Sequence, residues 1–105
     1  MLLSLDKKDY GVFVTSDLMR SIDGTLTVTV CDLEDLKLDE LEGHPLFEQT
    51  VKVELKANEN RKFVLEGLNE YLSKVDLQKI YVKLELTEGD TLTAERKCFF
   101  HAFFE

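Results

Sequence analysis

Two cysteines and two histidines are the first side chains of this 105-residue chain to test as a nucleophile–base pair or as zinc ligands. Cys98 and His101 are three residues apart, and in a β-strand that spacing places two side chains on opposite faces. A reactive thiol needs a base beside it, so this pair does not predict nucleophilic catalysis. The other two residues, Cys31 and His44, add no close-set pair of the kind that zinc sites require.

An acidic segment between two predicted strands is the candidate for a calcium site, because calcium binds clustered oxygen atoms. An EF-hand loop needs acids at alternate positions, a central glycine and a closing glutamate. Four leucines interrupt that order, so we predict a solvated loop with room for one helical turn, and the alternative is an adventitious cation site. The acids are Asp32, Glu34, Asp35, Asp39, Glu40 and Glu42, and the leucines are Leu33, Leu36, Leu38 and Leu41.

Two glutamates, Glu59 and Glu70, each follow an asparagine, which is an arrangement that carries the acid/base in many sugar hydrolases. Glycoside hydrolysis needs two carboxyl groups that converge in a cleft, roughly 5–10 Å apart. Both glutamates fall in predicted turns between short strands, so we interpret the pattern as coincidence. The five glycines are scattered singly and form no phosphate-binding loop. The sequence therefore predicts no catalytic residue, no cofactor-binding residue and no metal ligand.

Composition and charge describe a globular domain with an acidic surface. Hydrophobic residues make up 44% of the chain and charged residues 32%, which is typical of one domain with one core. Thirteen Lys and Arg against 21 Asp and Glu give a net charge of −8, which argues against nucleic acid and anionic membranes as partners. No apolar run is long enough to span a membrane, and "MLLSLDKKDY" has no basic start and too short an apolar stretch for a signal peptide.

Strict alternation of apolar and polar residues predicts β-strands along most of the chain. In "SIDGTLTVTVCDL", Leu26, Val28 and Val30 alternate with threonines. The other predicted strands are Tyr10–Leu18, Leu46–Leu55, Lys62–Gly67, Lys79–Leu86 and a last strand or strand pair over Thr91–Phe104. Pro45 stands at a strand start, where its missing N–H does least harm.

Turns and one short helix are predicted between these strands. Asp23 and Gly24 are expected to supply the positive φ of a tight turn, and Glu88–Asp90 is expected to turn the chain again. Residues 56–61 form a polar turn cluster, and Leu68 and Leu72 are spaced for one or two helical turns.

About seven strands with turns between them predict an all-β, immunoglobulin-like antiparallel sandwich that occupies residues 1–105 as a single domain. Leu26, Val28 and Val30 then need a second layer, and the apolar faces of Phe47–Leu55 and Ile80–Leu86 are expected to pack on or beside them. Cys31 shares its face with the threonines, away from the core, so we predict two thiols and no disulfide with Cys98.

Aromatic residues at two places bear on binding. Phe99 and Phe103 have one parity and Phe100 and Phe104 the other, so both faces of the last strand are covered or one pair lies at a domain junction. Of the three tyrosines, Tyr81 is predicted to point out of its strand, which makes it the best available platform for a sugar.

Four segments that together cover most of Tyr10 to Phe100 carry a family resemblance. They are "YGVFVTSDL", "DGTLTVTVCDLE", "TVKVELKANENRKFVLEGLNEYL" and "IYVKLELTEGDTLTAERKCFF". Their order of strand motifs, with a leucine-x-x-Tyr-Leu corner and a hairpin into an aromatic strand, resembles the immunoglobulin-like accessory domains that follow the catalytic barrel of β-mannosidases in glycoside hydrolase family 2. The chain departs from that pattern at Ser16-Asp17, where the family often has Asn-Asp, and in its longer, more acidic loop from Leu33 to Leu46.

The resemblance implies a non-catalytic domain that packs against the other domains of a parent glycoside hydrolase, since in that family the catalytic glutamates lie on the barrel. No catalytic residue carries over to any position of this chain. Two alternatives remain: a carbohydrate-binding module with an exposed aromatic strip, and a stand-alone interaction module that pairs its edge strands with a partner.

Overall fold

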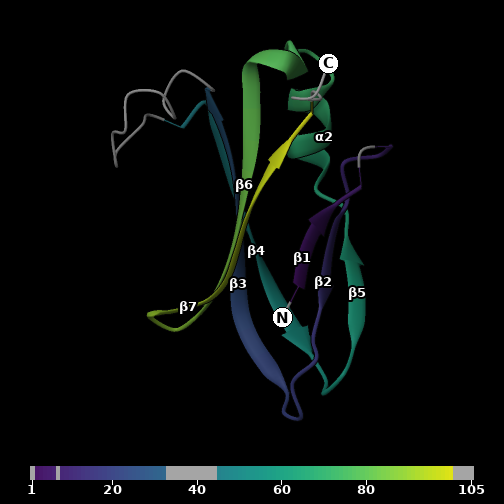
Figure 1. Cartoon of the computed structure of the whole chain (residues 1–105), viewed down its shortest axis with the longest axis vertical. Coiled ribbons are helices and arrows are strands. Elements are labelled where there is room, and N and C mark those ends of the chain that lie inside the picture. The colour runs from purple at the N-terminus through teal and green to yellow at the C-terminus, as the bar shows by residue number, and fades with distance from the viewer. Residues whose placement is uncertain (1, 7, 33–44, 101–105) are drawn as a thin grey trace.

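The computed structural model describes residues 2–6, 8–32 and 45–100, and within these ranges the chain forms seven strands, one α-helix and one 3-10 turn (Figure 1). The strands are β1 (Leu2–Leu5), β2 (Val12–Thr15), β3 (Ile22–Asp32), β4 (Phe47–Leu55), β5 (Asn60–Phe63), β6 (Ile80–Glu88) and β7 (Thr91–Phe99). The helix α2 (Glu66–Leu72) and the 3-10 turn η1 (Leu77–Lys79) lie between β5 and β6.

The strands form two antiparallel sheets that face each other (Figure 1). The larger sheet has the order β4-β3-β6-β7 and the smaller one the order β1-β2-β5. The chain passes from one sheet to the other between β2 and β3, between β4 and β5, and between β5 and β6. This arrangement confirms the predicted all-β, immunoglobulin-like sandwich.

The core lies between the sheets and is centred on the pair formed by β3 and β6. Leu26, Val28 and Val30 are 0% exposed, and their cross-strand partners on β6 are Leu86, Leu84 and Val82. β4 and β6 therefore lie beside β3 in the same sheet. The facing layer comes from the smaller sheet, and Leu68 and Leu72 of α2 close one end of the core.

One of the seven observed strands is not among those predicted from the sequence. Leu2–Leu5 was not predicted as a strand, yet it pairs with β2, and Leu3 is 2% exposed opposite Val14. Three of its four residues are leucines, so apolar and polar residues do not alternate and no period of two marks this strand in the sequence. At the other end β7 is one strand that ends at Phe99, and residues 101–105 lie outside the described part of the chain.

The predicted turn at Asp23 and Gly24 is wrong, because both residues lie inside β3 opposite Glu54 and Val53. Gly24 does not have a positive φ. A Cβ atom there would lie 2.3 Å from the backbone oxygen of Thr87, so the glycine permits a close approach of β3 to β6.

The reversal before β3 occurs earlier in the chain than the sequence predicted. The Leu18 N–H donates to the Ser16 hydroxyl, and the Leu18 carbonyl accepts from the Asn58 N–H. These two bonds hold the connection between β2 and β3 against the turn that precedes β5.

Three other boundaries were tested by the structure. Tyr10 lies outside β2 with φ 60°, in a loop where its N–H donates to the Asp6 backbone oxygen. β5 begins inside the expected turn cluster and stops before Val64, which is 59% exposed. The turn at Glu88–Asp90 is confirmed, with Gly89 at φ 61°.

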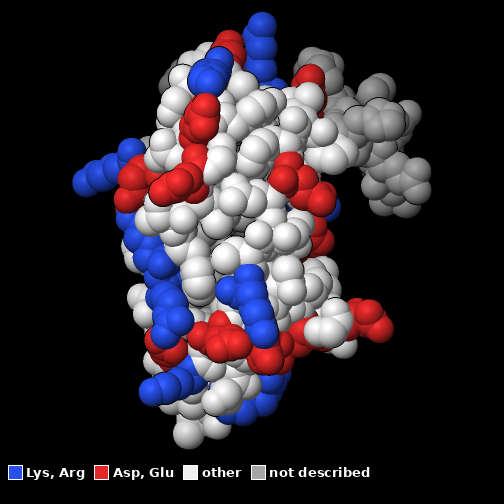
Figure 2. All heavy atoms as spheres, turned by 180° about the vertical axis from the view of Figure 1, so that it is seen from behind, with Lys and Arg blue, Asp and Glu red and all other residues white. Residues whose placement is uncertain are grey.

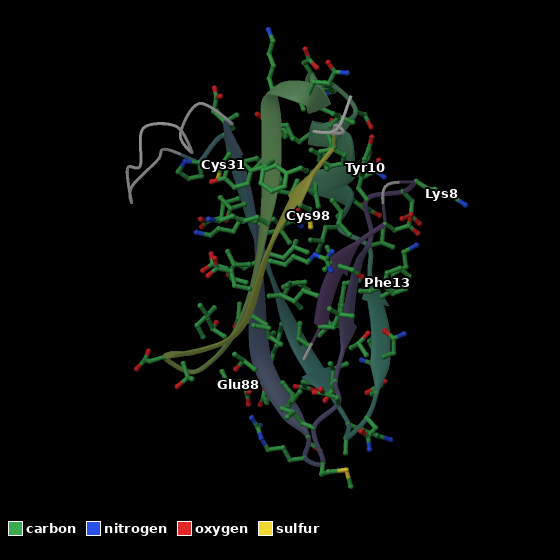
Figure 3. All side chains as sticks on the ribbon, viewed as in Figure 1. Lys8, Tyr10, Phe13, Cys31, Glu88 and Cys98 are labelled. Carbon is green, nitrogen blue, oxygen red and sulfur yellow. The ribbon has the colours of Figure 1, made fainter. Side chains whose placement is uncertain are left out.

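The two cysteines do not form a disulfide, as the sequence predicted. Figure 3 places Cys31 on the outer side of the larger sheet and Cys98 between the two sheets. Cys98 is 8% exposed and belongs to the core. Opposite faces of one sheet keep the two sulfur atoms apart.

The β3–β6 core predicts a large loss of stability when a central leucine is shortened. Leu84→Ala removes a side chain that is 0% exposed and is expected to lower the free energy of unfolding by about 2–5 kcal/mol. The matched control is Leu46→Ala, since Leu46 is 46% exposed and its truncation is expected to cost less than about 1 kcal/mol. Urea unfolding followed by circular dichroism measures both values. Equal losses would contradict the placement of the core.

The close approach at Gly24 predicts that even one methyl group is not tolerated there. Gly24→Ala is expected to lower the free energy of unfolding by about 1–3 kcal/mol, because the added carbon meets a backbone atom that cannot rotate away. Gly89→Asn is the control, since nothing lies within 4 Å of a Cβ at Gly89 and asparagine accepts a positive φ. Amide exchange near Thr25 and Thr87 should accelerate only in the Gly24 variant.

Candidate functional site

The two glutamates that follow asparagines occupy different elements and are held by local contacts. Glu59 accepts hydrogen bonds from the Lys56 N–H at 2.8 Å and from Arg61 at 2.7 Å, and these contacts lower the pKa of Glu59. Glu70 lies on α2, where its side chain is 72% exposed and pairs with Lys74. A general acid near neutral pH needs a raised pKa, so the environment of Glu59 opposes that role.

Tyr81 is on the outer face of the larger sheet but does not present an open ring. It is 7% exposed, and its ring stacks on Phe99 with a centroid distance of 5.6 Å. The expectation that Tyr81 is an exposed sugar platform is therefore wrong. Phe100 contacts the Tyr10 ring edge-on at 6.1 Å and packs against the core, which supports burial of that position. His101, Phe103 and Phe104 lie outside the described residues.

Most of the acidic segment, residues 33–44, also lies outside the described residues, so its two interpretations stay open. Elsewhere, in the part of the chain that the structure describes, no three His, Cys, Asp or Glu side chains are grouped to hold a metal ion. The helices in that part are too short or too polar to cross a membrane.

A pocket of about 400 Å³ opens at the end of the sandwich where β3 begins and β4 ends. Ile22 and Leu55 give it apolar walls, and both belong to the core. Charged residues of both signs and one serine complete the lining: Ser21, Asp23, Glu54, Lys56, Glu59 and Arg61. Its volume lies in the range of small-ligand pockets, roughly 300–1,000 Å³.

The lining of this pocket offers both hydrogen-bond donors and acceptors, which suits a neutral, hydroxylated ligand better than a single ion. None of the eight lining residues is aromatic, so a sugar ring would find no stacking surface there. Sequence reasoning missed the pocket because its residues come from three separate segments that only the folded chain brings together.

An ion pair joins the connection between the sheets to the β6–β7 hairpin. Both Nη atoms of Arg20 donate to the Glu88 carboxylate, at 2.7 and 3.0 Å, and the Thr93 hydroxyl donates to the same group at 2.9 Å. These bonds lower the pKa of Glu88 to about 2, with Arg20 as the largest cause. Figure 3 shows Glu88 near one end of the larger sheet. The contact fixes the entry of the chain into β3.

A second cluster fixes the loop between β1 and β2. The Lys62 ammonium group contacts Asp9 at 2.5 Å and Asp6 at 3.4 Å, and it lies 5.3 Å from the centre of the Phe13 ring. Asp9 is the largest cause that raises the pKa of Lys62. Phe13 projects from the outer side of the smaller sheet (Figure 3). The Lys62 ammonium group therefore covers one face of the Phe13 ring.

Charged groups of both signs are interspersed on the face that Figure 2 shows, with broad uncharged areas between them. Along the left edge of that view, basic side chains form a narrow column that is bordered by acidic groups.

The order of the strands and their two facing sheets define an immunoglobulin-like sandwich. A family model described as the mannosidase Ig/CBM-like domain matches residues 8–103, which is nearly the whole chain. The chain therefore belongs to this family and is an accessory domain of mannosidase-type glycoside hydrolases. A comparison with curated proteins gives no match.

The Arg20–Glu88 contact predicts a pH-dependent contribution to stability. Since the folded pKa of Glu88 is lowered, its stabilising effect is complete above the unfolded pKa near 4.5 and is lost as the pH falls toward about 2. Arg20 is 58% exposed, so screening by water keeps the effect small. Glu88→Gln should therefore be less stable than the native chain at pH 7 and equal to it near pH 2.

Chemical denaturation at several pH values tests this difference. Glu70→Gln is the control, since it removes an exposed pair on the helix surface and should leave the pH profile of stability unchanged. A constant difference between the Glu88 variant and the native chain from pH 7 to pH 2 would argue against an ionised contact.

Proposed function

We propose that this chain is a non-catalytic accessory domain of a glycoside hydrolase family 2 enzyme of the β-mannosidase type. It acts by packing against the sibling domains of its parent enzyme and by supporting the catalytic unit. The match of the mannosidase Ig/CBM-like family model to residues 8–103 is the observation that carries this proposal. Residues 1–105 constitute one sandwich domain in that larger chain.

The contacts of the carboxylates support a role without catalysis. Glu59 and Glu88 have lowered pKa values because they accept hydrogen bonds from basic side chains or backbone N–H groups. Groups of this kind hold turns in place and do not transfer protons near neutral pH. Two sheets packed around one core likewise suit a domain that positions its neighbours.

The coding region on both sides of residues 1–105 tests the proposal. We expect the same reading frame to encode a catalytic barrel, and we expect the isolated chain to leave aryl β-mannosides unhydrolysed. Excision of the domain from the parent enzyme should lower the melting temperature of the enzyme and change kcat/KM for a small aryl β-mannoside little. A frame with no barrel on either side would contradict the proposal.

Carbohydrate binding is the second candidate function, and the mixed-charge pocket beside Glu59 favours it. Titration of the isolated chain with mannooligosaccharides, followed by two-dimensional NMR, should then shift the amide signals of Ser21, Asp23 and Lys56. Glu59→Gln should weaken those shifts and Glu70→Gln should not. Unchanged spectra at millimolar sugar would remove this candidate and leave the accessory role untouched.

A further inference from the structure

The outer face of the larger sheet carries its charges in segregated rows. On β6 and β7, Lys83 lies directly opposite Lys97, and one row further along Glu85 lies directly opposite Glu95. Thr29 and Thr27 continue these two rows onto β3. The face therefore has a positive row beside a negative row, and the two rows are about 7 Å apart along the strands.

This arrangement is unfavourable for the isolated sheet, because like charges directly opposite each other on antiparallel strands repel. Within the described ranges Lys83 pairs with Glu85 along its own strand at 3.5 Å, while Lys97 and Glu95 form no ion pair and are exposed. Exchanging Glu95 and Lys97 would give two attractive cross-strand pairs from the same composition. Local conflicts of this kind occur where a surface serves a partner.

The two rows are complementary to themselves. A second copy can be placed with its outer face toward the first. A twofold axis between the two faces, perpendicular to the strands and midway between the rows, then places the positive row of each copy over the negative row of the other. Lys83 then lies over Glu85 of the second copy, and Lys97 lies over Glu95 of the second copy. Because the axis applies each contact twice, the face forms four Lys–Glu contacts.

We infer that the β6–β7 part of this outer face is the contact surface for a second copy of this chain, in a face-to-face twofold dimer. Apolar groups flank the charged rows on β7. Leu92, which is 48% exposed, lies next to the negative row, and Phe99 lies next to the positive row. The same axis therefore places Leu92 of each copy near Phe99 of the other copy. Isologous contacts of this kind are the commonest form of oligomer.

This inference goes beyond the accessory role and does not depend on the identity of the parent enzyme. Surface ion pairs each contribute little, so the isolated chain is expected to form a weak dimer. Sedimentation equilibrium at concentrations from about 10 μM to about 1 mM covers the matching range of dissociation constants.

Lys97→Glu separates the dimer contact from folding stability. It places the new carboxylate over Glu95 of the second copy at both ends of the interface, and the dissociation constant is expected to rise about tenfold or more. Within one copy it replaces repulsion from Lys83 by attraction, so the melting temperature should stay equal or rise. A merely destabilising substitution would lower both properties.

The exchange variant Glu95→Lys with Lys97→Glu provides the rescue. Its rows remain complementary under the same axis, since the carboxylate introduced on one copy faces the ammonium group introduced on the other. The dimer should therefore return to near its native strength.

Lys74→Glu is the matched control for the single substitution. It makes the same change of net charge as Lys97→Glu, but on the surface near α2 and away from the sheet face. It should leave the dissociation constant within about twofold of the native value.

Three results would overturn the inference. The first is a strict monomer at the highest concentration. The second is a dimer that Lys97→Glu affects no more than Lys74→Glu does. The third is a failure of the exchange variant to restore association while its melting temperature shows that it is folded. None of these results would bear on the coding-region test of the accessory role.

Discussion

The pairing of β3 with β6 is the contact on which the rest of the structure depends. Along both strands every second side chain is removed from water, and Leu26, Val28 and Leu84 are each 0% exposed. Each such leucine or valine contributes roughly 1.5–3 kcal/mol relative to an exposed position. β4 and β7 extend this pair sideways, while the smaller sheet and α2 cover it. The immunoglobulin-like sandwich is the way the chain buries one apolar face.

The polar contacts fix geometry more than they add stability. Arg20 and Glu88 join the entry of β3 to the β6–β7 hairpin, and Lys62 holds the loop between β1 and β2. Arg96 reaches from β7 to the backbone oxygen of Leu3 at 3.1 Å, which links the edges of the two sheets. Exposed pairs contribute little energy each. Together these contacts hold the loops and the edges of the two sheets in fixed positions.

The strands that were predicted well are those with several alternations. β3 and β6 have long runs in which the apolar positions are unmistakable, and α2 was indicated by Leu68 and Leu72 four residues apart. β1 was missed because its residues, Leu-Leu-Ser-Leu, do not alternate between apolar and polar. Gly24 was misinterpreted as a turn residue, since a glycine that permits close approach and one that permits a positive φ look the same in sequence.

The sequence by itself determined the layer class, the inward faces of β3, β4 and β6, and the absence of a disulfide, because these follow from parity along one strand. The family resemblance was also visible in the sequence, since the order of the strand motifs can be recognised without coordinates. Only the tertiary structure decided that Tyr81 is covered, that residues from three segments form a pocket, and that like charges meet across β6 and β7. Such facts depend on which strands become neighbours and in which register, and register is set by packing between residues far apart in the chain.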